Sequence, residues 1–472
     1  MTERIPKSIF AAALVLGVVL LAFVAYSGPD GFTSQTNLGG VLLLEFLAIA
    51  VWMYRRVFFP LIIVAFLLAG VDLPVGVVWT SVRWLFLGVG ALVGGVLMLK
   101  ERSHHFGLFH ILALFASLAT LVSAAVSQYP SVALSKALSF GLLFLYAGTG
   151  ARLAVTGREN RFFSGVLTGC EVFVGAIAVL YALGIGAMGN PNSLGAVMGV
   201  VGAPILLWGA LLEEAPMVHR RRLVLYGICM YLAFHSHARA GLAAALISSG
   251  LLGVALRKYK MLAKGASLVL VLVAAGAIIQ PEALSNTYSD VTSSLIYKGA
   301  HDTSLLASRE SPWRAAVDSI RNHVWFGTGL GTAENSNDPS GHQAMFSSTT
   351  EVSTEKGSSY LSIVAGVGVV GAVPFFLLLA MLLGKVFRTV MWMLKTGSPC
   401  HPAVPFAMVM VAGMIHAGFE DWLFAPGYYL CVFFWASAFV LVDVAPTSGP
   451  RTAFAWRLRA PQQGLGETAP SR

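Results

Sequence analysis

Long apolar windows recur along almost the whole chain and constrain its fold more than any other feature. They are long enough to cross a bilayer as helices and too long for barrel strands. Only 11% of the 472 residues are charged and the mean hydropathy is +0.75, whereas soluble domains carry about 25% charged residues. The sequence predicts an all-α polytopic membrane protein with about 12–14 transmembrane helices. The windows are 9–26, 38–54, 57–79, 84–99, 107–126, 131–151, 162–187, 192–212, 223–236, 240–256, 265–280, 359–384, 401–418 and 424–442.

The distribution of lysine and arginine predicts which helix ends face the cytoplasm. With the N-terminus inside, 23 of the 31 Lys and Arg residues fall in the inner segments and the C-terminal tail. Cytoplasmic loops retain positive charge, so we expect both termini inside and residues 281–358 outside. In that segment nine acidic residues outnumber five basic ones. The placement of the basic residues, rather than the net charge of +9, therefore argues against a nucleic-acid partner.

The predicted organisation is one membrane domain with one large extracytoplasmic loop. We expect residues 1–444 to form the helical domain, with 281–358 as its periplasmic loop. Residues 445–472 are expected to form a disordered cytoplasmic tail, because they are rich in Pro, Gly, Ser and Thr. The first window is interpreted as a retained span, since no small-residue cleavage site ends it. The four cysteines lie in or beside apolar windows, so we expect buried thiols and no disulfide framework.

A short amphipathic helix is predicted within the outer loop. Ser311 suits the N-cap and Pro312 the first helical position, and the residues that follow have an apolar face at helical spacing. Arg309 would then precede the helix N-terminus, where free N–H groups and the helix dipole favour an anion. A surface network of Arg309 with Glu310 and Asp318 is the alternative.

Two other features of the outer side allow both a structural and a functional interpretation. The glycines of FGTGLGT (326–332) lack the strand–turn–helix context and the Lys-Ser/Thr of a P-loop, so we expect them to turn the chain under the membrane surface. Arg239 lies in a short hairpin at the outer rim and could instead snorkel to headgroups. His235 and His237 beside it do not share a helical face and have no evident third ligand, so no metal site is expected.

Four short sequence elements follow one another around the outer loop. They are GNPNSLGAVMG (189–199), ARAG (238–241), SRESPWRAAVDSIRNHVWFGTGLGT (308–332) and GSSYLSIVAGVGVVG (357–371). In kind and order they resemble elements of the O-antigen ligase and O-antigen polymerase superfamily of bacterial envelope membrane proteins. The four together are specific for the superfamily but not for its branches.

The resemblance implies a glycosyltransferase that needs no metal, cofactor or nucleotide sugar. Its donor would be a glycan linked to undecaprenyl pyrophosphate, and Arg239 and Arg309 match the two arginines that bind the pyrophosphate. Guanidinium groups make bidentate, permanently charged contacts to phosphate, and cations aimed at this leaving group stabilise the charge that grows on it. Further substrate-binding residues are expected in or beside the same elements: Lys356, Arg314, Asn192 and Tyr360.

The chain departs from the ligase branch at Gly357, where that branch places a histidine. A histidine base therefore cannot be assigned here. Glu355 is the predicted catalytic base, because it could accept the proton of an attacking sugar hydroxyl, and Lys356 could support the pyrophosphate. His342 is an alternative base, and a surface pair of Glu355 with Lys356 is the structural alternative.

Other polar residues in or beside the windows are candidates because charge in a membrane is costly. Lys136 lies near the outer end of one window, Glu171 lies within another, and Glu420 and Asp421 lie at the last outer turn. Those at outer ends could line a lipid or acceptor groove, and each could equally be structural. Interfacial anchors are expected at Trp422, Tyr428 and Tyr429.

We therefore expect a polysaccharide polymerase in the bacterial inner membrane, which extends an exopolysaccharide or O-antigen at the periplasmic face. The missing ligase histidine favours this reaction over ligation of the glycan to lipid A-core or another acceptor. A transporter or flippase is less favoured, because repeated halves and paired broken helices are not evident. The expected partners are the lipid-linked donor, a glycan acceptor, membrane lipids and polysaccharide assembly or export proteins.

Overall fold

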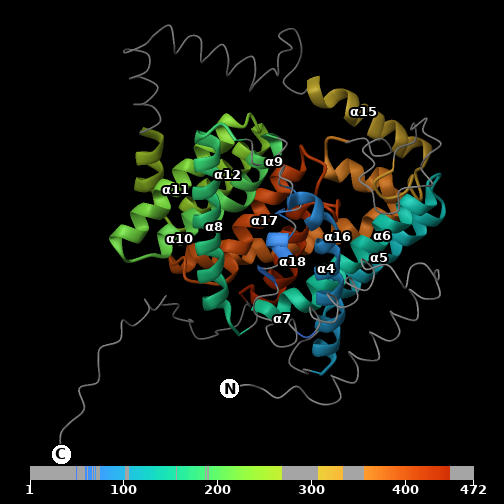
Figure 1. The fold of residues 1–472 in the computed structure, drawn as a ribbon, viewed down its shortest axis with the longest axis horizontal. Coiled ribbons are helices and arrows are strands. Elements are labelled where there is room, and N and C mark those ends of the chain that lie inside the picture. Colours follow the sequence, from blue (N-terminus) through green and yellow to red (C-terminus); the bar gives the residue numbers. More distant parts are fainter. Residues whose placement is uncertain are drawn as a thin grey trace, which may run out of the picture.

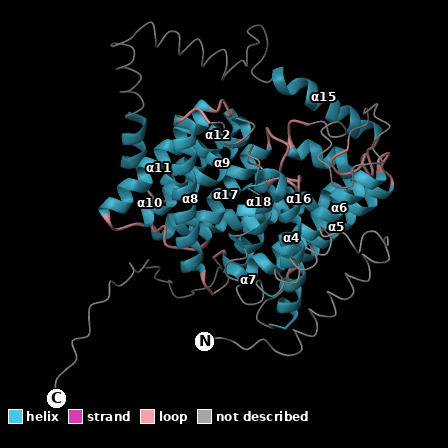
Figure 2. Ribbon diagram, in the orientation of Figure 1, coloured by secondary structure: helices cyan, strands magenta, loops and turns pink. Residues whose placement is uncertain are grey.

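The computed structural model describes residues 49, 59–60, 62–65, 67–68, 70, 75–100, 106–155, 157–185, 188, 191–267, 307–332 and 356–446. Within these ranges the chain folds into helices joined by short loops (Figure 2). In chain order the elements are α4 (Val75–Lys100), α5 (Leu108–Ala125), α6 (Pro130–Tyr146), η1 (Ala147–Ala151), α7 (Arg152–Val155), α8 (Glu159–Ala182), α9 (Pro191–Val197), η2 (Met198–Gly202), α10 (Ala203–Leu212), α11 (Pro216–His235), α12 (Arg239–Ala255), α15 (Ala307–Asn322), α16 (Ser359–Thr396), α17 (Ala403–Ala417) and α18 (Tyr429–Val444).

Six helices of the described residues are long and apolar enough to cross a membrane, and α12, α17 and α18 are shorter apolar helices. The predicted all-helical polytopic membrane protein is thus confirmed. The windows 9–26, 38–54 and 265–280 lie wholly or largely outside the described residues, so the total of 12–14 helices stays a prediction. The Glu355 and His342 positions and the tail from residue 447 onward also lie outside them.

The structure corrects a helix boundary in α4. The windows 57–79 and 84–99 predicted a break at residues 80–83, but α4 runs from Val75 to Lys100. Arg83 is tolerated inside the helix because its Nη1 donates a hydrogen bond to the Gly427 carbonyl at 2.9 Å. A charged side chain that finds a partner in the bundle does not have to mark the end of a span.

α17 and α18 form the centre of the bundle (Figure 1). Every residue from Tyr429 to Leu441 is buried, which is the pattern of a helix enclosed by others on all sides. Exposed apolar side chains are instead found on peripheral helices such as α5 and α16. These helices supply the surface that faces lipid.

α15 lies across one end of the bundle, which we call the loop end (Figure 1). α6, α12 and α16 begin at this end, and the α17–α18 turn (residues 418–428) also reaches it. At the opposite end, Arg152 donates to both carboxylate oxygens of Asp443 at 2.6 and 2.9 Å. The predicted orientation places the loop end outside and the opposite end in the cytoplasm, and this assignment stays a prediction.

Candidate functional site

An interruption in α16 and the glycine segment 326–332 frame the site. At Gly368 the backbone leaves the helix, with φ 70° and ψ 176°, so carbonyls of the preceding turn lose their helical partners. N–H groups of the glycine segment donate to the Ala365 and Gly366 carbonyls at 3.0 and 2.9 Å. The glycines turn the chain with positive φ, as expected, and they also allow backbone contact with α16. The third and fourth predicted elements are therefore packed against each other.

The first turn of α16 is tied to the α17–α18 turn through Ser359. Its hydroxyl donates to the Glu420 carbonyl at 2.7 Å and accepts hydrogen bonds from the N–H groups of Trp422 and Leu423 at 3.1 and 3.0 Å. The Ser359 side chain is fully buried. These bonds fix the acidic pair Glu420 and Asp421 beside residues 356–359.

Arg309 reaches the α17–α18 turn from α15 and forms an ion pair with Glu420. Both side chains are mostly buried, with exposed fractions of 17% and 19%. α15 begins at Ala307, about one turn before the predicted N-cap Ser311, so the predicted helix start is wrong and Arg309 lies in the first turn. The Arg309–Glu420 pair holds this additional turn, although it places Pro312 inside the helix rather than at its first position.

The acids of the alternative surface network pair elsewhere on α15. Glu310 accepts a hydrogen bond from Arg314 at 2.7 Å, and Asp318 lies 3.6 Å from Arg321. Arg314, a predicted substrate-binding residue, is 72% exposed on this face. The geometry of α15 therefore favours Arg309, rather than Arg314, as a member of the site.

Gly357, at the position of the ligase histidine, lies directly beside Arg309. Its φ of +64° is in the left-handed region, and a Cβ built on it would lie 3.3 Å from Arg309 Cδ and Nη1. Trp313 Nε1 donates to the Gly357 carbonyl at 3.1 Å, which ties α15 to the start of α16. The glycine lets Trp313 and Arg309 close onto the backbone here, and a histidine side chain would displace them.

Arg239 is the first residue of α12, ahead of its apolar stretch. The α12 backbone contacts α9 and η2: a Cβ at Gly241 would lie 2.4 Å from the Gly195 carbonyl oxygen, and one at Gly199 would lie 2.1 Å from that of Gly241. The first and second predicted elements therefore also pack together. Burial and, next, the positive charge of Arg309 lower the pKa of Arg239. The two predicted arginines thus act on each other electrostatically.

Two lysines add positive charge around Asp421. Lys356 is 7% exposed, and its backbone N–H lies 3.4 Å from Asp421 Oδ2. Lys136 Nζ donates to the Gly331 carbonyl at 2.6 Å, and the Asp421 carboxylate acts on it electrostatically. Lys136 thus holds the end of the glycine segment against α6.

Six charged side chains at the loop end form a positive cluster. Four cations and two carboxylates give a net charge of 4 − 2 = +2. Such a partly buried excess of positive charge favours an anion over a neutral ligand. The oxygens of a diphosphate would match the guanidinium and ammonium donors. The members are Arg239, Arg309, Lys136, Lys356, Glu420 and Asp421.

The remaining predicted residues lie near the cluster or have structural contacts. The Tyr360 hydroxyl donates to the Met414 carbonyl at 2.6 Å, which packs α16 on α17. Asn192 lies in α9, and its neighbour Ser193 accepts hydrogen bonds from Tyr428 and Tyr429 at the start of α18. Glu171 accepts a hydrogen bond from Arg222 at 2.8 Å and is structural.

Two of the three expected interfacial anchors are buried instead. Trp422 is 4% exposed and donates from Nε1 to His416 Nδ1 at 2.6 Å. Tyr429 is also 4% exposed, and its hydroxyl lies 2.9 Å from that of Tyr428. The anchor prediction is wrong for Trp422 and Tyr429, because polar partners inside the bundle satisfy their N–H and O–H groups.

Some residues of the site were not predicted as such. Ser359 was quoted only as part of the fourth sequence element, and Glu420 was not connected to Arg309. One sequence signal was available: two consecutive acids in a turn between two apolar windows require positive partners. It did not identify those partners, because they are distant in sequence.

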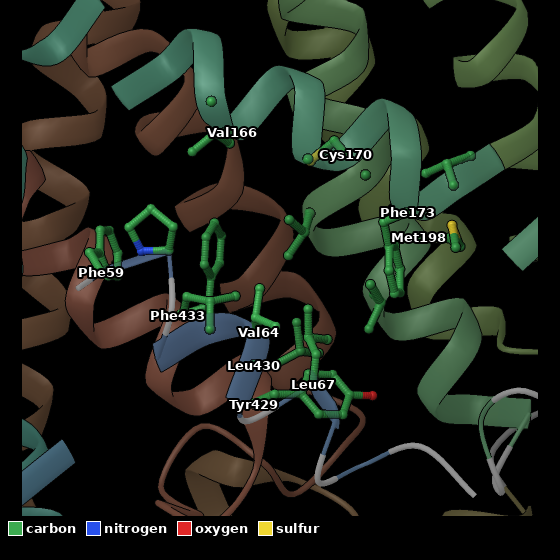
Figure 3. Close-up of a pocket in the computed structure, with 18 of the residues that line it drawn as sticks. Phe59, Val64, Leu67, Val166, Cys170, Phe173, Met198, Tyr429, Leu430 and Phe433 are labelled. Atoms are coloured by element: carbon green, nitrogen blue, oxygen red, sulfur yellow. The ribbon is translucent and has the colours of Figure 1, made fainter. Parts of the chain in front are cut away.

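An apolar cavity of about 210 Å³ lies between the segment around Phe59 and Leu67, α8, the α9–η2 helix and α18 (Figure 3). Tyr429 lines it and also donates to the Ser193 carbonyl at 3.3 Å, beside Asn192. On α8, Gly165 and Gly169 line the cavity, and a Cβ at either position would meet no atom within 4 Å. The cavity has the chemistry of a site for a hydrocarbon chain.

Comparison with known protein families supports the resemblance that the sequence elements carry. Residues 223–376 match the family model described as O-Antigen ligase. The match includes α12 with Arg239, α15 with Arg309, the glycine segment and the first half of α16. No curated protein matches the chain. The expected resemblance to the O-antigen ligase and polymerase superfamily is thereby confirmed over these residues, about a third of the chain.

Proposed function

We propose that this protein polymerises oligosaccharide repeat units linked to undecaprenyl pyrophosphate, at the periplasmic face of the inner membrane. In the proposed reaction, a hydroxyl at the non-reducing end of one lipid-linked unit attacks the anomeric carbon of the lipid-linked chain. The new C–O bond forms as the bond to the phosphate oxygen breaks. Undecaprenyl pyrophosphate leaves with the bonding electron pair, and a protein base takes the hydroxyl proton.

The gathering of two arginines and two lysines around only two carboxylates at the loop end, with a net charge of +2, is the observation that supports this proposal most strongly. Positive charge that is already in place stabilises a diphosphate leaving group more as its charge grows. Glu420 would hold Arg309 in position before the donor arrives. The glycine at position 357 favours polymerisation over ligation, because the ligase branch has a histidine there.

The interruption in α16 supports an enzyme rather than a transporter. Broken helices of transporters present unpaired backbone groups to ions or substrates. Here the Gly366 carbonyl accepts hydrogen bonds from the Gly329 N–H at 2.9 Å and the Ser123 hydroxyl at 2.5 Å. The freed carbonyl is thus used to hold the glycine segment.

The direct test uses purified protein in detergent and lipid-linked oligosaccharides extracted from a strain lacking it. We expect longer lipid-linked glycans by mass spectrometry, in buffer without ATP, ion gradient or divalent metal. Transfer only when lipid A-core is added would show a ligase instead. An unchanged glycan length with both acceptors would contradict the proposed function.

Glu355→Gln is expected to reduce turnover by at least about 100-fold, because the amide cannot accept the hydroxyl proton. Donor binding should change little, since the cationic cluster is intact. Glu351→Gln, in the same loop, is the matched control and should retain activity. Wild-type turnover in the Glu355 variant would remove Glu355 as the base and leave His342 to be tested.

Gly169→Leu should separate the function of the apolar cavity from that of the charged cluster. The leucine would occupy the cavity, and losing even two buried methylene groups of a lipid tail costs about 1.6 kcal/mol, roughly tenfold in affinity. We expect a raised KM for the undecaprenyl donor and little change for a donor with a ten-carbon tail. Gly175→Leu, on the same helix and outside the cavity, is the matched control because its Cβ also meets no atom within 4 Å. Equal KM changes in the two variants would show that the cavity does not bind the tail.

A further inference from the structure

Three consecutive apolar side chains are exposed directly after α15. Val324, Trp325 and Phe326 have exposed fractions of 39%, 66% and 48%. The sequence NHVWFGTGLGT (322–332) contains no Asp, Glu, Lys or Arg. In a loop surrounded by water, such a group would be an unusual exposed patch.

The same segment lies beside the interior of α16 rather than above its end. The Val369 N–H donates to the Val324 carbonyl at 2.8 Å, and a Cβ at Gly368 would lie 2.2 Å from the Trp325 carbonyl oxygen. Gly368 is nine residues after Ser359, the start of α16, which is about 13 Å along a helix axis. The loop therefore descends alongside a membrane-spanning helix.

Neighbouring helices expose apolar side chains next to this segment. On α5, Leu118 and Val122 are 46% and 49% exposed, and on α16, Val370 and Val373 are 53% and 51% exposed. The two helices are joined at this level by the Ser123–Gly366 hydrogen bond of 2.5 Å. The exposed apolar residues after α15 thus continue the lipid-facing surface of α5 and α16.

The backbone of the segment also fits a position at membrane depth. Irregular backbone is tolerated there only where its polar groups find partners in the protein. The Val324 carbonyl accepts from the Val369 N–H, the Gly327 N–H donates to the His323 carbonyl at 3.1 Å, and the next two N–H groups donate to α16 carbonyls. The polar groups face the protein while the apolar side chains face away from it.

We propose that Val324–Phe326 is a re-entrant membrane anchor that inserts into the lipid leaflet at the loop end. Its partner is the acyl-chain and headgroup boundary, where tryptophan is favoured. The anchor follows α15 directly, so it holds that helix, and with it Arg309, against the leaflet in which a lipid-linked substrate would lie. The insertion itself does not depend on the proposed reaction.

Cysteine labelling in lipid nanodiscs tests the anchor. Trp325→Cys and the matched control Asp318→Cys, on the exposed polar face of α15, are each reacted with a charged maleimide and with a lipophilic maleimide. Modification is quantified by mass spectrometry of the peptide, so the native cysteines do not interfere. We expect the charged reagent to modify position 325 at least about tenfold more slowly than position 318, because a charged molecule is excluded from the hydrocarbon region. The lipophilic reagent enters the leaflet and should modify position 325 readily.

Two results would overturn the anchor. Equal rates at both positions with the charged reagent would place the segment in water. Protection of position 325 from both reagents would show that protein, such as a second copy of this chain, covers the patch instead of lipid. A Phe326→Cys variant gives an independent measurement if the Trp325 variant does not fold.

Discussion

Replacing Arg309 by alanine is expected to lower glycan transfer by at least about 100-fold, the loss that follows removal of one group that stabilises transition-state charge. The variant should insert into the membrane normally. The effect should appear mainly in kcat, since the leaving diphosphate gains charge as the bond breaks. Arg309→Lys should recover only part of the rate, because an ammonium group lacks the bidentate geometry of guanidinium. The measurement is turnover of the lipid-linked donor by purified protein.

Arg321→Ala is the matched control on the same helix. Arg321 is 76% exposed and pairs with Asp318 across one turn, and such surface pairs contribute about 0–1 kcal/mol. Its turnover should equal that of the wild type. Arg239→Ala should lose activity like Arg309→Ala, and full activity in both arginine variants would contradict a diphosphate site at the loop end.

Loss of folding can be distinguished from loss of chemistry through Glu420. In Arg309→Ala, the Glu420 carboxylate loses its ion-pair partner while it is only 19% exposed, and an uncompensated buried charge destabilises a protein. The double variant Arg309→Ala/Glu420→Gln should recover thermal stability without recovering turnover. Recovery of turnover in the double variant would show that Arg309 acts only as a structural partner of Glu420.

The sequence predicted the features that depend only on the composition of each helix. Apolar windows identified the spans from α5 onward, because crossing a membrane requires long apolar helices whatever they pack against. Prediction failed where a distant partner decides the outcome. Arg83 lies inside α4 because Gly427 accepts its hydrogen bond, and α15 starts early because Glu420 pairs with Arg309. Trp422 is a different case, because its partner His416 is only six residues earlier in the chain.

The site was predictable to a similar extent. The resemblance indicated Arg239 and Arg309, and in the structure Arg239 begins α12 while Arg309 lies in the first turn of α15. The resemblance did not indicate Glu420 or Ser359 as structural supports, because these contacts join α15 and α16 to a turn far along the chain. The position of Val324–Phe326 beside α16 was likewise not predictable, because a glycine-rich stretch after a polar helix has the pattern of an ordinary outer loop.

Gly241→Ala is expected to be the most damaging small substitution near the site. Its Cβ would lie 2.4 Å from the Gly195 carbonyl oxygen, a backbone atom that cannot rotate away. α12 and α9 must then separate, and overpacking of this kind costs about 1–3 kcal/mol. Because Arg239 lies two residues before Gly241, the separation also moves its guanidinium away from the proposed diphosphate site. We expect a lower thermal midpoint in detergent together with a loss of turnover of at least about tenfold.

Gly250→Ala on the same helix is the matched control, since its Cβ would meet no atom within 4 Å. Alanine is the better helix former by about 1 kcal/mol, so this variant should be as stable as the wild type or more stable, with full turnover. If Gly241→Ala behaves in the same way, α9 and α12 do not touch as the structure shows. If it loses stability but keeps its turnover, the close approach of the two helices serves the fold alone, and the position of Arg239 must then be set by its contacts at the loop end.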